Sequence, residues 1–214
     1  MTDRCERCGK PAAVCVCDRI EPLETRVRVL VLQHPQEDDV VLGTAKLLAL
    51  SMPRCEVRSG LSWPNLAAAL GGAAGQEAHA DRWAVLRPTP RPADLPPALA
   101  SAPVVLLDRK GRLREESAPP IEGVIALDGT WSQAKTLWWR NAWLLKLAQV
   151  SLHPREPSMY GKLRREPRRE WVSTLEAVAD VLPALGEPEE TRATLRRLLR
   201  TMLQRARDAR APNQ

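Results

Sequence analysis

The sequence predicts an α/β protein whose mostly parallel sheet has helices on both faces and follows a small cysteine-rich module. The first observation is a set of short apolar runs with strand character, at 27–32, 83–86, 103–107 and 124–127. The second is a set of segments with apolar residues at helical spacing, at 40–50, 66–70, 133–148 and 191–207. Strands that alternate with helices are typical of a parallel sheet covered on both sides. The third is a group of four cysteines ahead of the first strand, in a stretch too short to bury a core.

Composition and charge narrow the class of protein. The chain has 214 residues, 44% hydrophobic and 27% charged, which is typical of a globular protein with one sizeable core. It carries 32 Lys and Arg against 26 Asp and Glu, and the net charge of +6 favours acidic partners such as nucleic acid. Charges interrupt every hydrophobic run well before the roughly 18 apolar residues of a membrane span. The first residues are charged and unlike a secretory signal, so we expect a cytoplasmic protein.

The leading cysteines have the spacing C-x2-C-x6-C-x-C, at Cys5, Cys8, Cys15 and Cys17. Four thiolates commonly close a tetrahedral zinc site, and thiols in the cytosol stay reduced. We therefore predict a structural Zn²⁺ with no open position for water. Two disulfides or free thiols are the alternative. Cys55 stands apart from the group and is expected to be a small packed residue.

Two of the apolar runs end in an aspartate, as VVLLD at Asp108 and VIALD at Asp128. Ligands of open parallel sheets bind beyond the carboxyl ends of the strands, so we expect both carboxylates at one edge. Asp128 continues as Asp128-Gly129-Thr130-Trp131 into a helix, a combination that could bind a cationic or aromatic ligand. The alternative is that Asp128 or Thr130 only caps the helix.

The first strand is followed by Gln33-His34-Pro35-Gln36-Glu37. His34 and Glu37 are candidate substrate contacts there, whereas a lone histidine can equally be a structural residue. Neither a dinucleotide-binding glycine motif nor a phosphate-binding P-loop occurs.

A basic stretch near the end of the chain mixes cations with aromatic rings. Lys162, Arg164, Arg165, Arg168 and Arg169 surround Tyr160 and Trp171. Grooves that bind single-stranded or loop RNA use this mixture, and a solvated basic face is the alternative. Trp138 and Trp139 are adjacent in a helix, so we expect one of them to be exposed.

A second helix start is predicted where Ser173 and Glu176 form a capping box. The helix should end or bend at Pro183, because proline cannot continue the backbone hydrogen bonds.

Four segments resemble the DTW-domain family, whose signature is Asp-x-Thr-Trp. They are LDGTWSQAKTLWWRN, PSMY at 157–160, LRREP at 163–167 and STLEA at 173–177, and they follow the cysteine group in the family's order. The resemblance covers roughly residues 5 to 185. One position departs from the pattern, since Gly43 stands before Thr44 where relatives often have Asn.

The resemblance implies a function and a fold. It implies transfer of the 3-amino-3-carboxypropyl group from S-adenosylmethionine to N3 of a uridine in tRNA, with release of methylthioadenosine. Kinship with ribosomal-RNA enzymes of the same chemistry implies a SPOUT-like, trefoil-knotted α/β fold. We expect a zinc module at 1–22, a catalytic domain at 23–186 and a basic C-terminal helix at 187–214, in a monomer or weak dimer. Two alternatives stay open: a non-catalytic zinc-containing RNA-binding protein, and an S-adenosylmethionine-dependent RNA methyltransferase on the same fold.

The resemblance also suggests roles for single residues. Asp128 is the candidate general base, or it holds the ammonium group of the donor. Candidate donor contacts are Leu127, Asp128, Thr130, Trp131, Ser173, Thr174 and Glu176. Candidate RNA contacts are His34, Glu37, Trp139, Arg140, Tyr160, Arg164, Arg165, Arg168 and Arg169.

Overall fold

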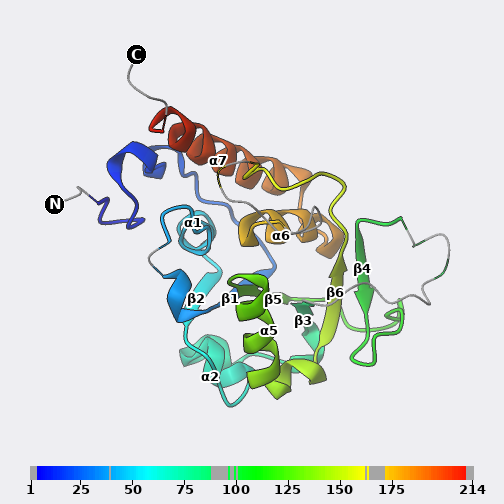
Figure 1. Cartoon of the computed structure of the whole chain (residues 1–214). Helices are drawn as coiled ribbons and strands as arrows, with labels where there is room; N and C mark the ends of the chain where they lie inside the picture. The colour runs from blue at the N-terminus through cyan, green and yellow to red at the C-terminus, as the bar shows by residue number, and fades with distance from the viewer. Residues whose placement is uncertain are drawn as a thin grey trace.

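A computed structural model describes residues 4–38, 40–87, 96, 99, 101–161, 163 and 172–210. Within this part of the chain six strands form one sheet in the order β2-β1-β5-β3-β6-β4 (Figure 1). The strands are β1 (Arg28–Gln33), β2 (Cys55–Ser59), β3 (Trp83–Leu86), β4 (Val104–Leu107), β5 (Gly123–Asp128) and β6 (Ala148–Leu152). All neighbours are parallel except β4, which is antiparallel to β6. The predicted mostly parallel α/β sheet is therefore confirmed.

Helices cover both faces of the sheet. They are α1 (Ala45–Ser51), α2 (Leu66–Leu70), α3 (Gly72–Gln76), α5 (Trp131–Arg140), α6 (Thr174–Val181) and α7 (Glu189–Asp208). Alternate residues of β1 enter different apolar cores, because successive side chains of a strand point to opposite faces. Val29 and Val31 pack with α1, α6 and α7, whereas Leu30 and Leu32 pack with α2 and α5. In Figure 1 these two groups of helices lie above and below the sheet. No helix in the described residues is both long and apolar enough to cross a membrane.

The cysteine-rich segment packs on the C-terminal helix. It forms two short 3-10 helices, Ala12–Val14 and Cys17–Arg19, beside α7 (Figure 1). Val16 is fully buried, and Arg205 of α7 donates hydrogen bonds to both carboxylate oxygens of Asp18 at 2.8 Å. Arg205 holds the pKa of Asp18 at about 2, below its ordinary value. The segment lacks a core of its own and uses that of the larger body. The exact boundaries of the three expected parts stay a prediction.

The structure differs from the sequence prediction in two strands, in one additional helix, α3, and in the bounds of two helices, since α1 begins at Ala45 and not at 40. No strand was predicted at β2 or β6, and the helix predicted over 133–148 ends at Arg140. Asn141 ends it, because its buried side-chain amide accepts from Trp63 N and donates to the Leu61 and Leu137 carbonyls. The Leu and Trp spacing that suggested a longer helix continues instead into a 3-10 turn, Ala142–Lys146, and then into β6.

The expectation that Asp108 and Asp128 share one edge is wrong. Because β4 runs antiparallel, Leu107 pairs with Gln149 near the amino end of β6. Asp108 therefore lies at the opposite edge from Asp128. There its carboxylate accepts hydrogen bonds from the backbone of Lys110 and from the backbone and guanidinium of Arg112, and so it stabilises a turn.

Candidate active site and metal centre

The carboxyl ends of β1 and β5 bring two predicted segments together. Gln33 and Asp128 are partners in the strand register. The Gln33 side-chain amide donates to Asp128 Oδ2 at 2.8 Å, and the His34 backbone N–H donates to the Asp128 carbonyl at 2.9 Å. The strand-end rule, applied to β1 itself, would have identified Gln33, which the sequence analysis did not single out.

Asp128 is fixed from a second direction by the start of α6. The Thr174 hydroxyl donates to Asp128 Oδ1, and only 6% of the Asp128 residue is exposed. A carboxylate has about four lone-pair sites, so two donors orient it and leave acceptor capacity for a ligand. The structure thus places Asp128 beside Thr174, one of the predicted donor contacts. Leu127, another, is half-buried and packs against the α5 side of the sheet.

The turn from β5 into α5 is held by its own capping box. Thr130 Oγ1 accepts from Gln133 N at 3.4 Å, and Thr130 N donates to Gln133 Oε1 at 2.6 Å. A Cβ on Gly129 would lie 2.8 Å from Gln133 Cβ, so only glycine fits this close approach. The cap of α5 is therefore Thr130, and Asp128 does not serve as that cap. The Gln133 side chain also donates to Gln36 Oε1 at 2.9 Å, which ties the turn to the segment after β1.

The capping box predicted at the start of α6 is confirmed, and it reaches further than the sequence indicated. Glu176 is fully buried, and its carboxylate accepts from Ser173 N, Ser173 Oγ, Ser158 Oγ and Met159 N at 2.7–3.1 Å. The PSMY and STLEA segments are thereby joined. Because this carboxylate is enclosed and bonded by the protein, it positions Ser173 and the start of α6. Its predicted contact with the donor stays a prediction.

Replacing Glu176 by Ala is expected to lower the free energy of unfolding by about 3 kcal/mol, because it leaves several buried donors without an acceptor. Urea unfolding measures the loss. Exposed Glu190 in the first turn of α7 is the matched control, and its change to Ala should alter stability by less than about 0.5 kcal/mol. Equal stability of the two variants would contradict this role.

The loop between β1 and α1 lies against the same helix start. Thr44 Oγ1 accepts from Leu175 N at 3.2 Å. The Tyr160 hydroxyl donates to the Leu42 carbonyl at 2.7 Å, and Lys10 Nζ donates to the Val41 and Gly43 carbonyls at 2.8 and 2.6 Å. Three separate parts of the chain therefore fix this loop.

Tyr160 and Glu37, two of the predicted RNA contacts, are buried. Tyr160 is 2% exposed and Glu37 is 6% exposed, so neither side chain offers a surface to a polymer in this structure. Basic and aromatic residues around Tyr160 suggested a groove, but its ring fills the core beside α6 and α7. His34 is half-buried, and its Nδ1 accepts from Gln36 N at 3.3 Å, in line with a structural role.

Lys10 is a buried cation that the sequence analysis missed. Burial lowers its pKa to about 8, nearby Lys46 also lowers it, and the charges of Cys8 and Asp128 act in the opposite direction. The side chain extends from the cysteine segment to the loop between β1 and α1, where it donates to the Val41 and Gly43 carbonyls. No sequence signal marks it, since both of its acceptors are backbone carbonyls.

The four leading cysteines come together as predicted. Their Sγ atoms all lie within 4.8 Å of one another, and the Cys5–Cys17 and Cys8–Cys15 pairs are each 3.7 Å apart. Corners of a zinc tetrahedron with bonds of about 2.3 Å are about 3.8 Å apart, so the sulfur positions fit Zn²⁺. The hydrogen bond from the Cys8 backbone lowers the pKa of Cys5 to about 6, whereas burial raises those of Cys15 and Cys17. A cation among the thiolates would offset that burial cost.

The remaining predicted RNA contacts divide into two groups. Trp139 is 69% exposed and Arg140 is also exposed, both at the end of α5, while Trp138 is buried. One exposed tryptophan of the pair was expected, and this is confirmed. Four predicted contacts lie outside the described residues: Arg164, Arg165, Arg168 and Arg169. Lys162 and Trp171 lie outside them as well.

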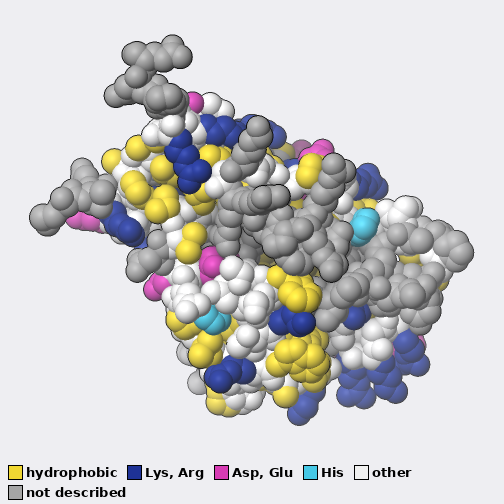
Figure 2. Space-filling model, viewed as in Figure 1, with side chains coloured by type: hydrophobic (Ala, Val, Ile, Leu, Met, Phe, Trp, Pro, Cys, Tyr) yellow, Lys and Arg dark blue, Asp and Glu magenta, His cyan; other side chains and the backbone are white. Residues whose placement is uncertain are grey.

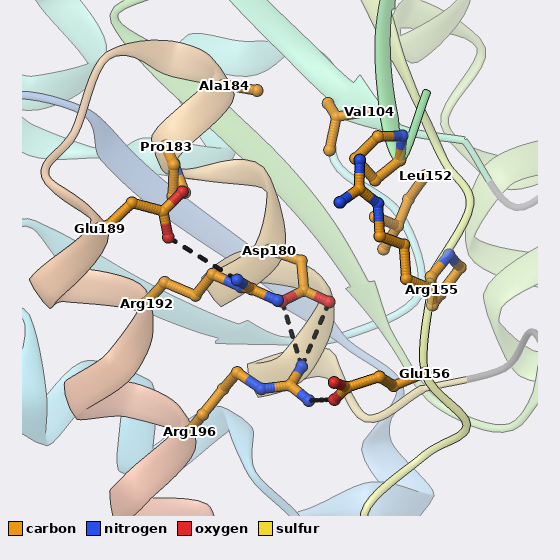
Figure 3. A pocket seen from close by; sticks show the side chains of 12 residues that line it. Val104, Leu152, Arg155, Glu156, Asp180, Pro183, Ala184, Glu189, Arg192 and Arg196 are labelled. Carbon is orange, nitrogen blue, oxygen red and sulfur yellow. Dashed lines mark hydrogen bonds and ion pairs between the residues drawn. The ribbon is translucent and has the colours of Figure 1, made fainter. Parts of the chain in front are cut away.

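A cavity of about 400 Å³ lies between the β4–β6 end of the sheet and helices α6 and α7 (Figure 3). Arg196 donates to both Asp180 oxygens and to Glu156, and Arg192 Nε donates to Asp180 at 2.8 Å. This hydrogen bond raises the pKa of Arg192. Since carboxylates already pair with both arginines, we interpret the network as a brace between α6 and α7.

Fold and site together define an α/β protein with a buried carboxylate at a strand end, two capped helix starts and a four-cysteine cluster. The DTW domain model matches residues 2–207, and the chain belongs to that family. The signature falls on the turn that carries Asp128, Thr130 and Trp131.

Curated proteins are similar to most of the chain. The chain is 32% identical over 204 residues to tRNA-uridine aminocarboxypropyltransferase 2 of Drosophila melanogaster, covering 94% of this chain and 73% of that protein. It is 28% identical over 207 residues to the Macaca fascicularis protein of the same name, covering 92% and 61%. It is 28% identical over 207 residues to tRNA-uridine aminocarboxypropyltransferase A of Arabidopsis thaliana, covering 86% and 73%. No solved structure matches the chain.

Proposed function

We propose that this protein transfers the 3-amino-3-carboxypropyl group of S-adenosylmethionine to N3 of a uridine in tRNA. The observation that carries the proposal is the position of the family signature. Asp128 is a buried carboxylate at the end of β5, oriented by Gln33 and Thr174 and adjacent to an exposed aromatic helix start. The names of the relatives support tRNA and the transferred group.

The proposed chemistry uses Asp128 in one of two roles. As a base it accepts the N3 proton, and N3 then attacks the methylene carbon next to the sulfonium. The new N–C bond forms as that C–S bond breaks, and the electron pair stays on sulfur as methylthioadenosine leaves. As a ligand, Asp128 instead binds the ammonium group of the donor and aligns the chain for attack. Thr130, Trp131, Ser173 and Thr174 surround this corner as proposed donor contacts.

Three further features belong to the proposal. The knotted SPOUT-like arrangement rests on kinship of the family, and the mostly parallel sheet supports it. The cysteine cluster is proposed to hold a structural zinc ion that orders the segment and keeps Lys10 against the loop at Val41 and Gly43. The basic segment containing Arg164, Arg165, Arg168 and Arg169 is proposed to contact RNA in the cytoplasm.

Incubation with unmodified tRNA and S-adenosylmethionine, followed by mass analysis of the nucleosides, tests the function. The expected product is uridine with an added aminocarboxypropyl mass, together with methylthioadenosine. An added methyl mass with S-adenosylhomocysteine would identify the methyltransferase alternative. Binding without any change in mass would identify a non-catalytic RNA-binding protein. Fragmentation of the modified base distinguishes N3 from a ring carbon.

A further inference from the structure

One face of α5 carries aromatic rings and a cation at regular spacing. Trp131 is 39% exposed and Trp139 is 69% exposed, and Lys135 Nζ lies 4.1 Å from the centroid of the Trp131 ring. Residues four apart on a helix share a face, so Trp131, Lys135 and Trp139 form one stripe. Large apolar side chains exposed together on one face often mark a contact site, whereas single ones scattered over a surface need no explanation.

The segment that carries this stripe contains cations and no acids. Between Asp128 and Glu156 the chain contains no Asp or Glu, and the cations Lys135, Arg140 and Lys146 lie on or next to α5. Figure 2 shows hydrophobic side chains on both sides of a basic group in the region where Figure 1 places α5. Flat rings with cations between and beside them favour a partner that is both aromatic and anionic, and unpaired nucleic acid has both properties.

The stripe begins beside the candidate catalytic carboxylate. Trp131 follows Asp128 by three residues, and Trp139 lies about 12 Å further along the helix axis, since an α-helix rises about 1.5 Å per residue. That length exceeds a single base. Trp131 therefore lies at the catalytic corner, in line with its proposed contact to the donor, while Trp139 would meet a nucleotide away from that corner.

We propose that the α5 face, defined as Trp131, Lys135, Trp139 and Arg140, binds the unpaired strand of the substrate RNA that leads to the target uridine. Trp139 stacks on a base outside the catalytic corner, and Arg140 contacts a phosphate. This inference rests on the proposed function and assigns the surface that binds the RNA substrate.

Salt-dependent binding of an unmodified tRNA transcript tests the proposal. Trp139→Ala should weaken binding about tenfold or more without changing the slope of log K against log salt, because stacking releases no counterions. Trp139→Tyr should restore most of the affinity. Arg140→Ala should weaken binding and reduce the slope by about one. The matched control is Leu113→Ala, an exposed apolar residue at the opposite edge of the sheet, which should bind as the unaltered protein does.

Several outcomes would contradict the proposed binding of unpaired RNA by the α5 face. These are unchanged tRNA binding by Trp139→Ala, an equal loss for an RNA duplex without unpaired bases, or a change of oligomeric state that indicates a second copy as the occupant. Any of them, with tRNA still modified by the unaltered protein, rejects this surface and leaves the proposed function intact. Absence of any tRNA modification by the unaltered protein rejects the proposed function instead.

Discussion

Replacing Asp128 by Asn is expected to reduce aminocarboxypropyl transfer by about a hundredfold or more while the protein stays folded. A positioned base contributes roughly 10² to 10⁴ in rate, and the amide cannot accept the N3 proton. The fold should persist because Asn has nearly the same shape and still has an acceptor. Thr174 can reverse its hydroxyl and accept from the new amide, while Gln33 keeps a donor for the Asn oxygen. Initial rates with tRNA, together with a melting curve, measure both effects.

The same variant separates the two roles of Asp128. If the carboxylate is the base, Asp128→Asn should bind S-adenosylmethionine with nearly unchanged affinity and fail at the chemical step. If it binds the ammonium group, the loss of charge should weaken donor binding, since a charge-assisted hydrogen bond is roughly twice as strong as a neutral one. Calorimetric titration of the donor without RNA distinguishes these results.

Asp108→Asn is the matched control, because Asp108 also follows a VVLL-type strand but lies at the opposite edge. It should lose a turn contact with Arg112 and keep its transfer rate. A fully active Asp128→Asn protein would remove Asp128 from the mechanism. An equal loss in both variants would point to a general effect on folding.

The pair Asp108 and Asp128 shows how far the sequence predicts the site. Local sequence patterns are enough to predict four of the strands and the capping boxes of α5 and α6. The sequence analysis identified the four strands and the box at Ser173, and it missed the box at Thr130. Strand direction does not follow from a local pattern. Because β4 runs antiparallel to β6, Asp108 lies at the edge of the sheet opposite to the predicted one. The edge strand β2, in which Glu56 is half-buried and Arg58 is exposed, lacks the apolar run that made the central strands recognisable.

Long-range contacts explain the other differences. The sequence predicts Glu176 only as a capping residue. Its hydrogen bonds to Ser158 and Met159 could not be predicted, because they depend on the packing of the PSMY segment against the start of α6. Tyr160 lies among cations in the sequence, yet its hydroxyl reaches a carbonyl 118 residues away. Lys10 donates only to backbone carbonyls, which have no side-chain identity to recognise. Each of these residues is fixed by tertiary structure and not by its neighbours in the chain.

Replacing Cys8 by Ser is expected to abolish stoichiometric zinc binding and to unfold the cysteine segment. Cys8 is 3% exposed and supplies one of four clustered thiols, so its loss leaves an incomplete, weakly bound site. Metal binding in small zinc sites contributes about 10 kcal/mol or more to folding. The other described contacts of this segment are few: buried Val14 and Val16, the Arg205–Asp18 ion pair, and the Lys10 hydrogen bonds to the Val41 and Gly43 carbonyls. Metal analysis of the purified protein and a melting curve measure the loss.

Cys55→Ser is the control, because Cys55 is buried in the core and lies outside the cluster. It should keep one zinc per chain and lose only modest stability.

The pKa values of Cys15 and Cys17 are raised by burial, so these thiols are protonated at neutral pH without metal. Zinc binding must therefore release protons, and the affinity for zinc should fall as the pH is lowered.

Full zinc content in Cys8→Ser would show that the metal lies elsewhere. Cys8→Ser could also lose zinc and keep its transfer rate. That result would show that the metal is not needed to position the loop at Val41 and Gly43. Lys10 would then have no role in the activity of the site around Asp128.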